Sequence, residues 1–126
     1  MCGIVGILNS SSLKNNSIDI LKKLEYRGYD SAGISLFSKE RIKTIKSVGK
    51  ISELKNKAQN VSDKNFYGVI GHTRWATHGV VSKNNAHPFA NDDLTLVCNG
   101  IIENYRKIQN QFCLLYTSDA ADDLLC

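Results

Sequence analysis

The chain opens with Met1-Cys2-Gly3-Ile4-Val5-Gly6-Ile7, and the rest of the sequence is best understood outward from there. The apolar residues 4–8 predict a short buried strand that begins just after Cys2. If Met1 is removed, Cys2 carries both a thiol and a free α-amine, whose unperturbed pKa is about 7.7–8.0. A neutral amine beside a thiol can act as its general base, so the stretch predicts an N-terminal nucleophile. From these residues alone, Cys2 could equally be a packing residue at the start of a strand.

The composition fits a small globular protein. At 126 residues, 42% of them hydrophobic, the chain can form one domain with a modest core. It has neither an apolar run near the roughly 20 residues of a membrane span nor the features of a signal peptide. The four scattered cysteines are typical of reduced thiols, and the net charge of +4 is spread over many lysines. We therefore expect a cytoplasmic protein that binds neither membrane nor nucleic acid.

Hydrophobic spacing predicts alternating helices and strands. Ser17 is expected to cap a first helix, with Asp19 in its first turn and a polar loop over 10–16. Strands are predicted at 34–37 and 41–48 as a hairpin, and at 66–71 and 94–98, with further helices over 51–61 and 101–112. This order predicts an α/β or α+β domain with a mixed or antiparallel sheet.

Polar clusters follow or precede several of these strands, where loops can shape a pocket on a rigid base. Arg74-Trp75-Ala76-Thr77-His78 has the donors of a carboxylate clamp, although a surface Arg74 stacked on Trp75 is the simpler alternative. Asn99-Gly100 is either a hairpin turn or a pair of donors for an oxyanion, one of which is worth roughly 3–4 kcal/mol of barrier.

A metal centre is a weaker interpretation of the same residues. Cysteine and histidine occur at five positions of interest, but without ligand spacing: Cys2, His72, His78, His87 and Cys98. His72 and His78 are expected to lie in one glycine-bounded loop as hydrogen-bonding residues. The sequence therefore predicts no metal site.

Five motifs together resemble the N-terminal glutaminase domain of the glutamine–fructose-6-phosphate aminotransferases. They are Met1-Cys2-Gly3-Ile4-Val5-Gly6, residues 24–33 (LEYRGYDSAG), residues 71–79 (GHTRWATHG), Asn85-Ala86-His87-Pro88 and residues 99–104 (NGIIEN). The resemblance implies a class II glutamine amidotransferase with an α+β fold, the N-terminal-nucleophile αββα sandwich, here incomplete. The amidophosphoribosyltransferases, which share the Cys-Gly-Ile start but typically have glutamine where Tyr29 stands, are the alternative.

The resemblance also implies roles for individual residues. Cys2 matches the nucleophile, and Asn99 and Gly100 match the oxyanion hole. The residues that match the glutamine-binding site are Arg74 for the α-carboxylate, Trp75 at the gate towards an ammonia channel, and Thr77, His78 and His87 in the wall. No cofactor or metal is implied.

The reaction implied is hydrolysis of L-glutamine to glutamate and ammonia through a thioester. In the whole enzyme, a homodimer, the ammonia would pass to fructose 6-phosphate in sugar-isomerase domains that this chain lacks. An inactive binding domain of the same fold is a further alternative.

The sequence departs from the family pattern at two places. Cys98 stands where the family usually has a histidine before the Asn-Gly pair. Residues 1–112 match the domain, whereas the tail 113–126 does not and resembles a translated adapter sequence. A chain that stops inside a domain is expected to be inactive and poorly stable on its own.

Overall fold

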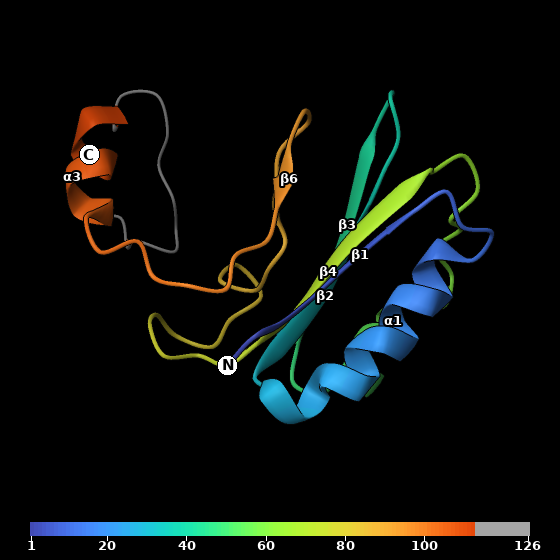
Figure 1. Cartoon of the computed structure of the whole chain (residues 1–126), viewed down its shortest axis with the longest axis horizontal. Coiled ribbons are helices and arrows are strands. Elements are labelled where there is room, and N and C mark those ends of the chain that lie inside the picture. Colours follow the sequence, from blue (N-terminus) through green and yellow to red (C-terminus); the bar gives the residue numbers. More distant parts are fainter. Residues whose placement is uncertain (113–126) are drawn as a thin grey trace.

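The computed structural model describes residues 1–112, so the predicted tail 113–126 lies outside the described residues. A four-stranded antiparallel sheet forms its centre (Figure 1). In spatial order its strands are β1 (Gly3–Leu8), β4 (Gly68–Arg74), β2 (Ser31–Phe37) and β3 (Ile42–Val48). The strand predicted after Cys2 and the predicted β2–β3 hairpin are both confirmed.

Two helices cover one face of this sheet. They are α1 (Leu13–Leu24), which is followed by the short 3-10 helix η1 (Glu25–Arg27), and α2 (Ile51–Ala58). The core between helices and sheet is aliphatic and almost fully buried, and it includes Leu21, Ile34, Leu36, Leu54 and Val69. Burial of such side chains, about 1.5–3 kcal/mol each, holds the sheet rigid beneath the loops at its ends.

The opposite face of the sheet is only partly covered. Ile4 and Leu8, on β1, remain 44% and 64% exposed on this side. The segment after β4 turns over this face and forms a second, two-stranded sheet of β5 (Phe89–Ala90) and β6 (Thr95–Leu96). The helix α3 (Tyr105–Phe112) ends the described chain, on the side of the sheet away from α1 (Figure 1). The result is an incomplete α+β sandwich.

The first helix begins earlier than predicted. Leu13, not Ser17, opens α1, and it is 1% exposed because it packs in the same core as Leu21. Ser17 lies inside the helix and donates its hydroxyl proton to the carbonyl of Lys14 at 2.8 Å, so it caps nothing. Asp19 is consequently a mid-helix residue. The loop predicted over 10–16 is wrong for this reason.

Other boundaries also differ. The strand predicted at 66–71 runs on to Arg74 as β4, which puts His72 on a strand rather than in a loop. The strand predicted at 94–98 shortens to β6, and the last helix begins only at Tyr105. The helix predicted over 51–61 ends at Ala58, and its first amide, from Ile51, donates to the Glu25 carboxylate at 2.7 Å.

Among the described residues, no helix has the length and apolarity needed to cross a membrane.

Candidate active site

Cys2 is fixed by the first pair of residues in the β1–β4 ladder. Gly3 lies opposite Thr73 and donates its amide proton to the Thr73 hydroxyl at 3.0 Å. A Cβ on Gly3 would lie 2.7 Å from that hydroxyl and 2.8 Å from the Cβ of Leu24, so only glycine fits there. The Cys2 thiol, which is partly buried, accepts the amide proton of Trp75 at 3.5 Å. The N-terminus and the end of β4 therefore lie together.

Arg74 closes the loop that follows β4. Its side chain is only 9% exposed, and its guanidinium donates to the backbone carbonyls of His78, Gly79 (3.4 Å) and Val80 (3.0 Å). A guanidinium has five N–H donors, so these three contacts leave donors for a further acceptor. The simple alternative of a surface arginine stacked on Trp75 is wrong, since Arg74 is buried and no stacking between the two is found in the described structure. Its neighbours Trp75, Thr77 and His78 are exposed on the same loop.

The segment after η1 fixes the beginning of this loop. The carboxylate of Asp30 accepts the amide proton of Ala76 at 2.7 Å, and the amide of Asp30 donates to the carbonyl of Arg74 at 3.1 Å. Gly28 packs directly against the peptide between Arg74 and Trp75. The family resemblance includes this segment, within residues 24–33, but implied no role for Asp30.

Two imidazoles contact the backbone of Cys98, the residue directly before the Asn99-Gly100 pair. His72, 1% exposed on β4, donates from Nε2 to the carbonyl of Cys98 at 2.9 Å, and the amide of Cys98 donates to Nδ1 of His87 at 3.2 Å. The two rings stand 4.2 Å apart, centroid to centroid.

Both histidines are neutral at physiological pH. Burial lowers the pKa of His72 to about 4, the charge of Arg74 acts in the same direction, and the hydrogen bond to Cys98 opposes them. Burial also lowers the pKa of His87 to about 4, together with the adjacent His72, Arg74 and Lys46. The hydrogen bond from the Cys98 amide requires a neutral His87, and a neutral His72 with its proton on Nε2 fits the bond to the Cys98 carbonyl.

All eight residues predicted for the site line one cavity of about 830 Å³. They come from the N-terminus, the loop after β4, the loop before β5 and the connection between β6 and α3. They are Cys2, Arg74, Trp75, Thr77, His78, His87, Asn99 and Gly100. Asn99 and Gly100 connect β6 to α3 and are not a hairpin turn.

The cavity has further walls that the sequence did not indicate. They come mainly from β4, from Cys98 and from α3 with the residues before it: His72, Asn85, Phe89, Cys98, Ile101, Ile102, Tyr105, Arg106 and Gln109. The helical spacing of Tyr105 and Gln109 was a usable signal, since residues four apart share a helix face. The sequence singled out His72 only as a hydrogen-bonding loop residue, because its place in the cavity wall depends on the extension of β4.

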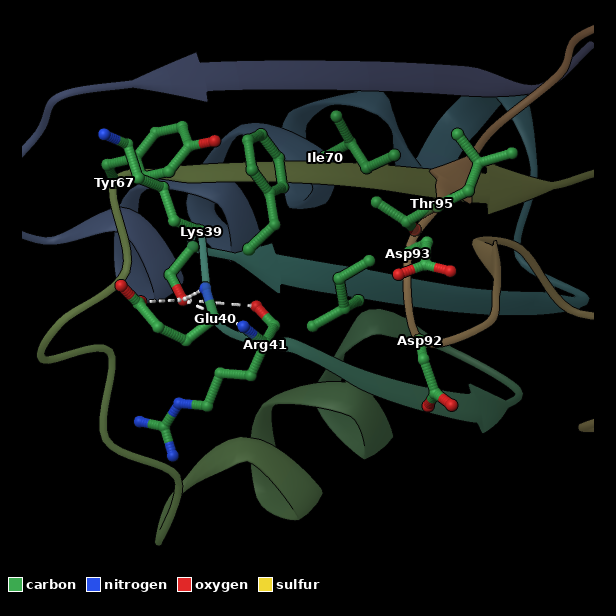
Figure 2. A pocket seen from close by; sticks show the side chains of 12 residues that line it. Lys39, Glu40, Arg41, Tyr67, Ile70, Asp92, Asp93 and Thr95 are labelled. Atoms are coloured by element: carbon green, nitrogen blue, oxygen red, sulfur yellow. Dashed lines mark hydrogen bonds between the residues drawn. The ribbon is translucent and has the colours of Figure 1, made fainter.

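A smaller hollow of about 380 Å³ lies over the far end of the sheet (Figure 2). Its lining includes the β2–β3 turn, Tyr67 and Ile70, and the turn between β5 and β6 with Asp92 and Asp93. None of the predicted site residues lines it. Within residues 1–112, no group of three or more histidine, cysteine or acidic side chains is arranged to hold a metal ion.

The chain is similar in sequence to curated aminotransferases. It is 48% identical to glutamine–fructose-6-phosphate aminotransferase [isomerizing] of Helicobacter pylori over 111 residues, which is 88% of this chain and 19% of that protein. It is 50% identical to the protein of the same name from Francisella tularensis over 112 residues, 86% of this chain and 18% of that protein. The chain thus spans about a fifth of the length of these relatives. No protein-family model matches it.

Two solved structures have a similar fold. The allosteric regulatory enzyme of purine biosynthesis is 27% identical, with a TM-score of 0.56 over 71% of this chain and 19% of that one. Glutamine phosphoribosylpyrophosphate amidotransferase from B. subtilis, complexed with ADP and GMP, has a TM-score of 0.59 over 99% of this chain and 26% of that one. At 24% identity, this second structure supports the fold alone.

The predicted α+β fold of the N-terminal-nucleophile amidotransferases is therefore confirmed, and the chain is 48–50% identical to the two aminotransferases but only 24–27% identical to the two solved structures. In sequence the chain is thus similar to about a fifth of the length of the glutamine–fructose-6-phosphate aminotransferases, and its fold is that of the N-terminal-nucleophile amidotransferases.

Proposed function

We propose that this chain carries the glutaminase site of a glutamine–fructose-6-phosphate aminotransferase and releases ammonia from the side-chain amide of L-glutamine. One observation carries the proposal. A thiol at position 2, a buried arginine and an Asn-Gly pair, contributed by separate parts of the chain, line a single cavity of about 830 Å³. A cavity of this size accommodates a small amino acid.

In the proposed mechanism Cys2 is the nucleophile. Removal of Met1, whose side chain is 70% exposed, leaves Cys2 with a free α-amine, which takes the thiol proton. The sulfur attacks the carboxamide carbon of glutamine, and the tetrahedral oxyanion forms within reach of the Asn99 amide and the Gly100 N–H. Collapse to a thioester transfers the proton to the departing ammonia. Water then cleaves the thioester, which releases glutamate and restores the thiol.

Arg74 is proposed to bind the α-carboxylate of glutamine. The three loop carbonyls that it already contacts hold the guanidinium still, and the donors left over suit a carboxylate. Such preorganisation reduces the entropy lost when the substrate binds. Thr77 and His78 are proposed to line the same subsite. Trp75, which is half-exposed and whose backbone amide donates to the Cys2 thiol, is proposed to form its gate.

The names of the curated relatives support a second substrate, fructose 6-phosphate, to which we propose the ammonia is passed by parts of the protein outside this chain. A homodimer without nucleic-acid partners is also proposed, together with a cytoplasmic location, where thiols stay reduced.

Measurement of glutamate release from glutamine tests the proposal in protein made from the complete reading frame that contains this chain. The wild type should release glutamate, and Cys2→Ala should not, while it still binds glutamine. Cys98→Ser is the matched control, because Cys98 is the other described thiol that lines the cavity. Release by Cys2→Ala at the wild-type rate would refute the proposed function.

A further inference from the structure

Both backbone groups of Cys98 are held by buried imidazoles, one from each side. The carbonyl of Cys98 can only accept, so Nε2 of His72 must carry a proton. The amide of Cys98 can only donate, so Nδ1 of His87 must be unprotonated to accept the bond. The contacts therefore fix the hydrogen-bonding state of both rings: His72 is a donor at Nε2 and His87 an acceptor at Nδ1.

The two rings sit on rigid supports. His72 belongs to the central strand β4, where it lies opposite Ile4 on one side and Gly33 on the other. The carbonyl of His87 lies against Gly33, at a distance that no Cβ would tolerate, so the loop before β5 rests directly on the sheet. Lys46 holds this loop from the other side, since its ammonium donates to the carbonyl of Ala86 at 2.8 Å.

The surroundings favour the neutral form of both rings, which the acceptor role of His87 needs. The charged groups that act on the pair, Arg74 and Lys46, are cationic and disfavour further protons. Nδ1 of His72 is buried, and no described group is hydrogen-bonded to it. At this position an unprotonated nitrogen without a hydrogen-bond partner costs less free energy than a buried N–H without an acceptor. The pair thus acts as a fixed donor and a fixed acceptor.

We propose that His72 and His87 are positioning residues that fix the backbone of Cys98 and thereby hold Asn99 and Gly100 in place for the oxyanion. The inference rests on the proposed glutaminase function. Asn99 and Gly100 are exposed and follow the short strand β6, so their own packing does little to fix them. Oxyanion donors must be held within a fraction of an ångström, and the clamp on Cys98 supplies that restraint one residue away.

Paired substitutions separate the effect of the hydrogen bonds on hydrolysis from the effect of side-chain volume. His87→Asn keeps an acceptor near the position of Nδ1, whereas His87→Leu has a similar shape and no acceptor. His72→Gln keeps a donor near the position of Nε2, whereas His72→Met does not. In the protein from the complete reading frame, we expect kcat for glutamine hydrolysis to fall about 10–100-fold in the Leu and Met variants, with KM within about threefold of wild type. The Asn and Gln variants should recover most of kcat.

Equal kcat values within each pair, Leu with Asn and Met with Gln, would overturn the proposal, since bulk alone would then explain the effect. If the apolar variants do not fold, nitrogen NMR of the wild-type imidazoles still decides: a proton on Nδ1 of His87 near pH 7 would overturn the clamp. A wild-type protein with the expected tautomers but no glutamine hydrolysis would refute the proposed function instead. Hydrolysis by a wild type with the wrong tautomers would refute only the present inference.

Discussion

Substitution of Gly28 by alanine should disturb the candidate site, although Gly28 itself has no contact with glutamine in the proposed mechanism. A Cβ at this position would lie 2.7 Å from the carbonyl carbon of Arg74 and 2.8 Å from both its oxygen and the nitrogen of Trp75. Ordinary contact begins at 3.4 Å, so the peptide between Arg74 and Trp75 must move by about 0.7 Å. The φ angle of Gly28 is 179°, an extended value that alanine adopts freely, so the effect is purely steric.

The moved peptide carries both the arginine side chain and the N–H that faces the Cys2 thiol. A misplacement near 1 Å can cost about 100-fold in rate, so Gly28→Ala should lower kcat/KM for glutamine by about 10–100-fold. Overpacking should also lower the free energy of unfolding by about 1–3 kcal/mol. Steady-state kinetics and thermal melts would measure both. Gly6→Ala is the matched control, because no described atom lies within 4 Å of the added Cβ. A Gly28→Ala protein with wild-type kcat/KM and stability would refute the reasoning.

The remaining predictions concern single side chains. Arg74→Ala should raise KM for glutamine more than it lowers kcat. The fall in kcat/KM should correspond to a loss of about 2–5 kcal/mol of transition-state binding. An unchanged KM in steady-state kinetics would contradict the carboxylate role. Asn99→Ala should instead lower kcat, by roughly 100-fold or more, with little change in KM; the same assay would exclude an oxyanion role if kcat stayed high. Glu25→Ala removes the carboxylate that accepts the first amide of α2, from Ile51, and should cost about 1 kcal/mol of stability in a denaturant melt. An unchanged midpoint would show that water replaces this cap without loss.

The sequence was most informative where local pattern and tertiary environment agree. The apolar run 4–8 forms the strand that it predicts, and the β2–β3 hairpin was predicted from two apolar runs around a polar turn. The eight candidate site residues were found because the motifs that carry them are specific, and they line one cavity. Their chemical roles remain predictions.

The errors have a common physical cause, which is that tertiary contacts override local signals. β4 continues through His72, Thr73 and Arg74, although these residues look like the start of a loop, because β1 and β2 both pair with it there. Ser17 looks like a helix cap, but the helix starts earlier since Leu13 is drawn into the core. The clamp on Cys98 was not predictable, because it joins a strand and a loop that only the folded sheet brings together.

The N-terminal peptide of the active protein offers the most direct test of the account. After treatment with a glutamine-like diazoketone and proteolysis, mass spectrometry reads both the state of Met1 and the site of the label. The account predicts that Met1 is absent, that the label is on Cys2, and that excess glutamine prevents it. Label on Cys98 instead, or a fully retained Met1 in protein that hydrolyses glutamine, would contradict the N-terminal nucleophile on which the proposed function depends.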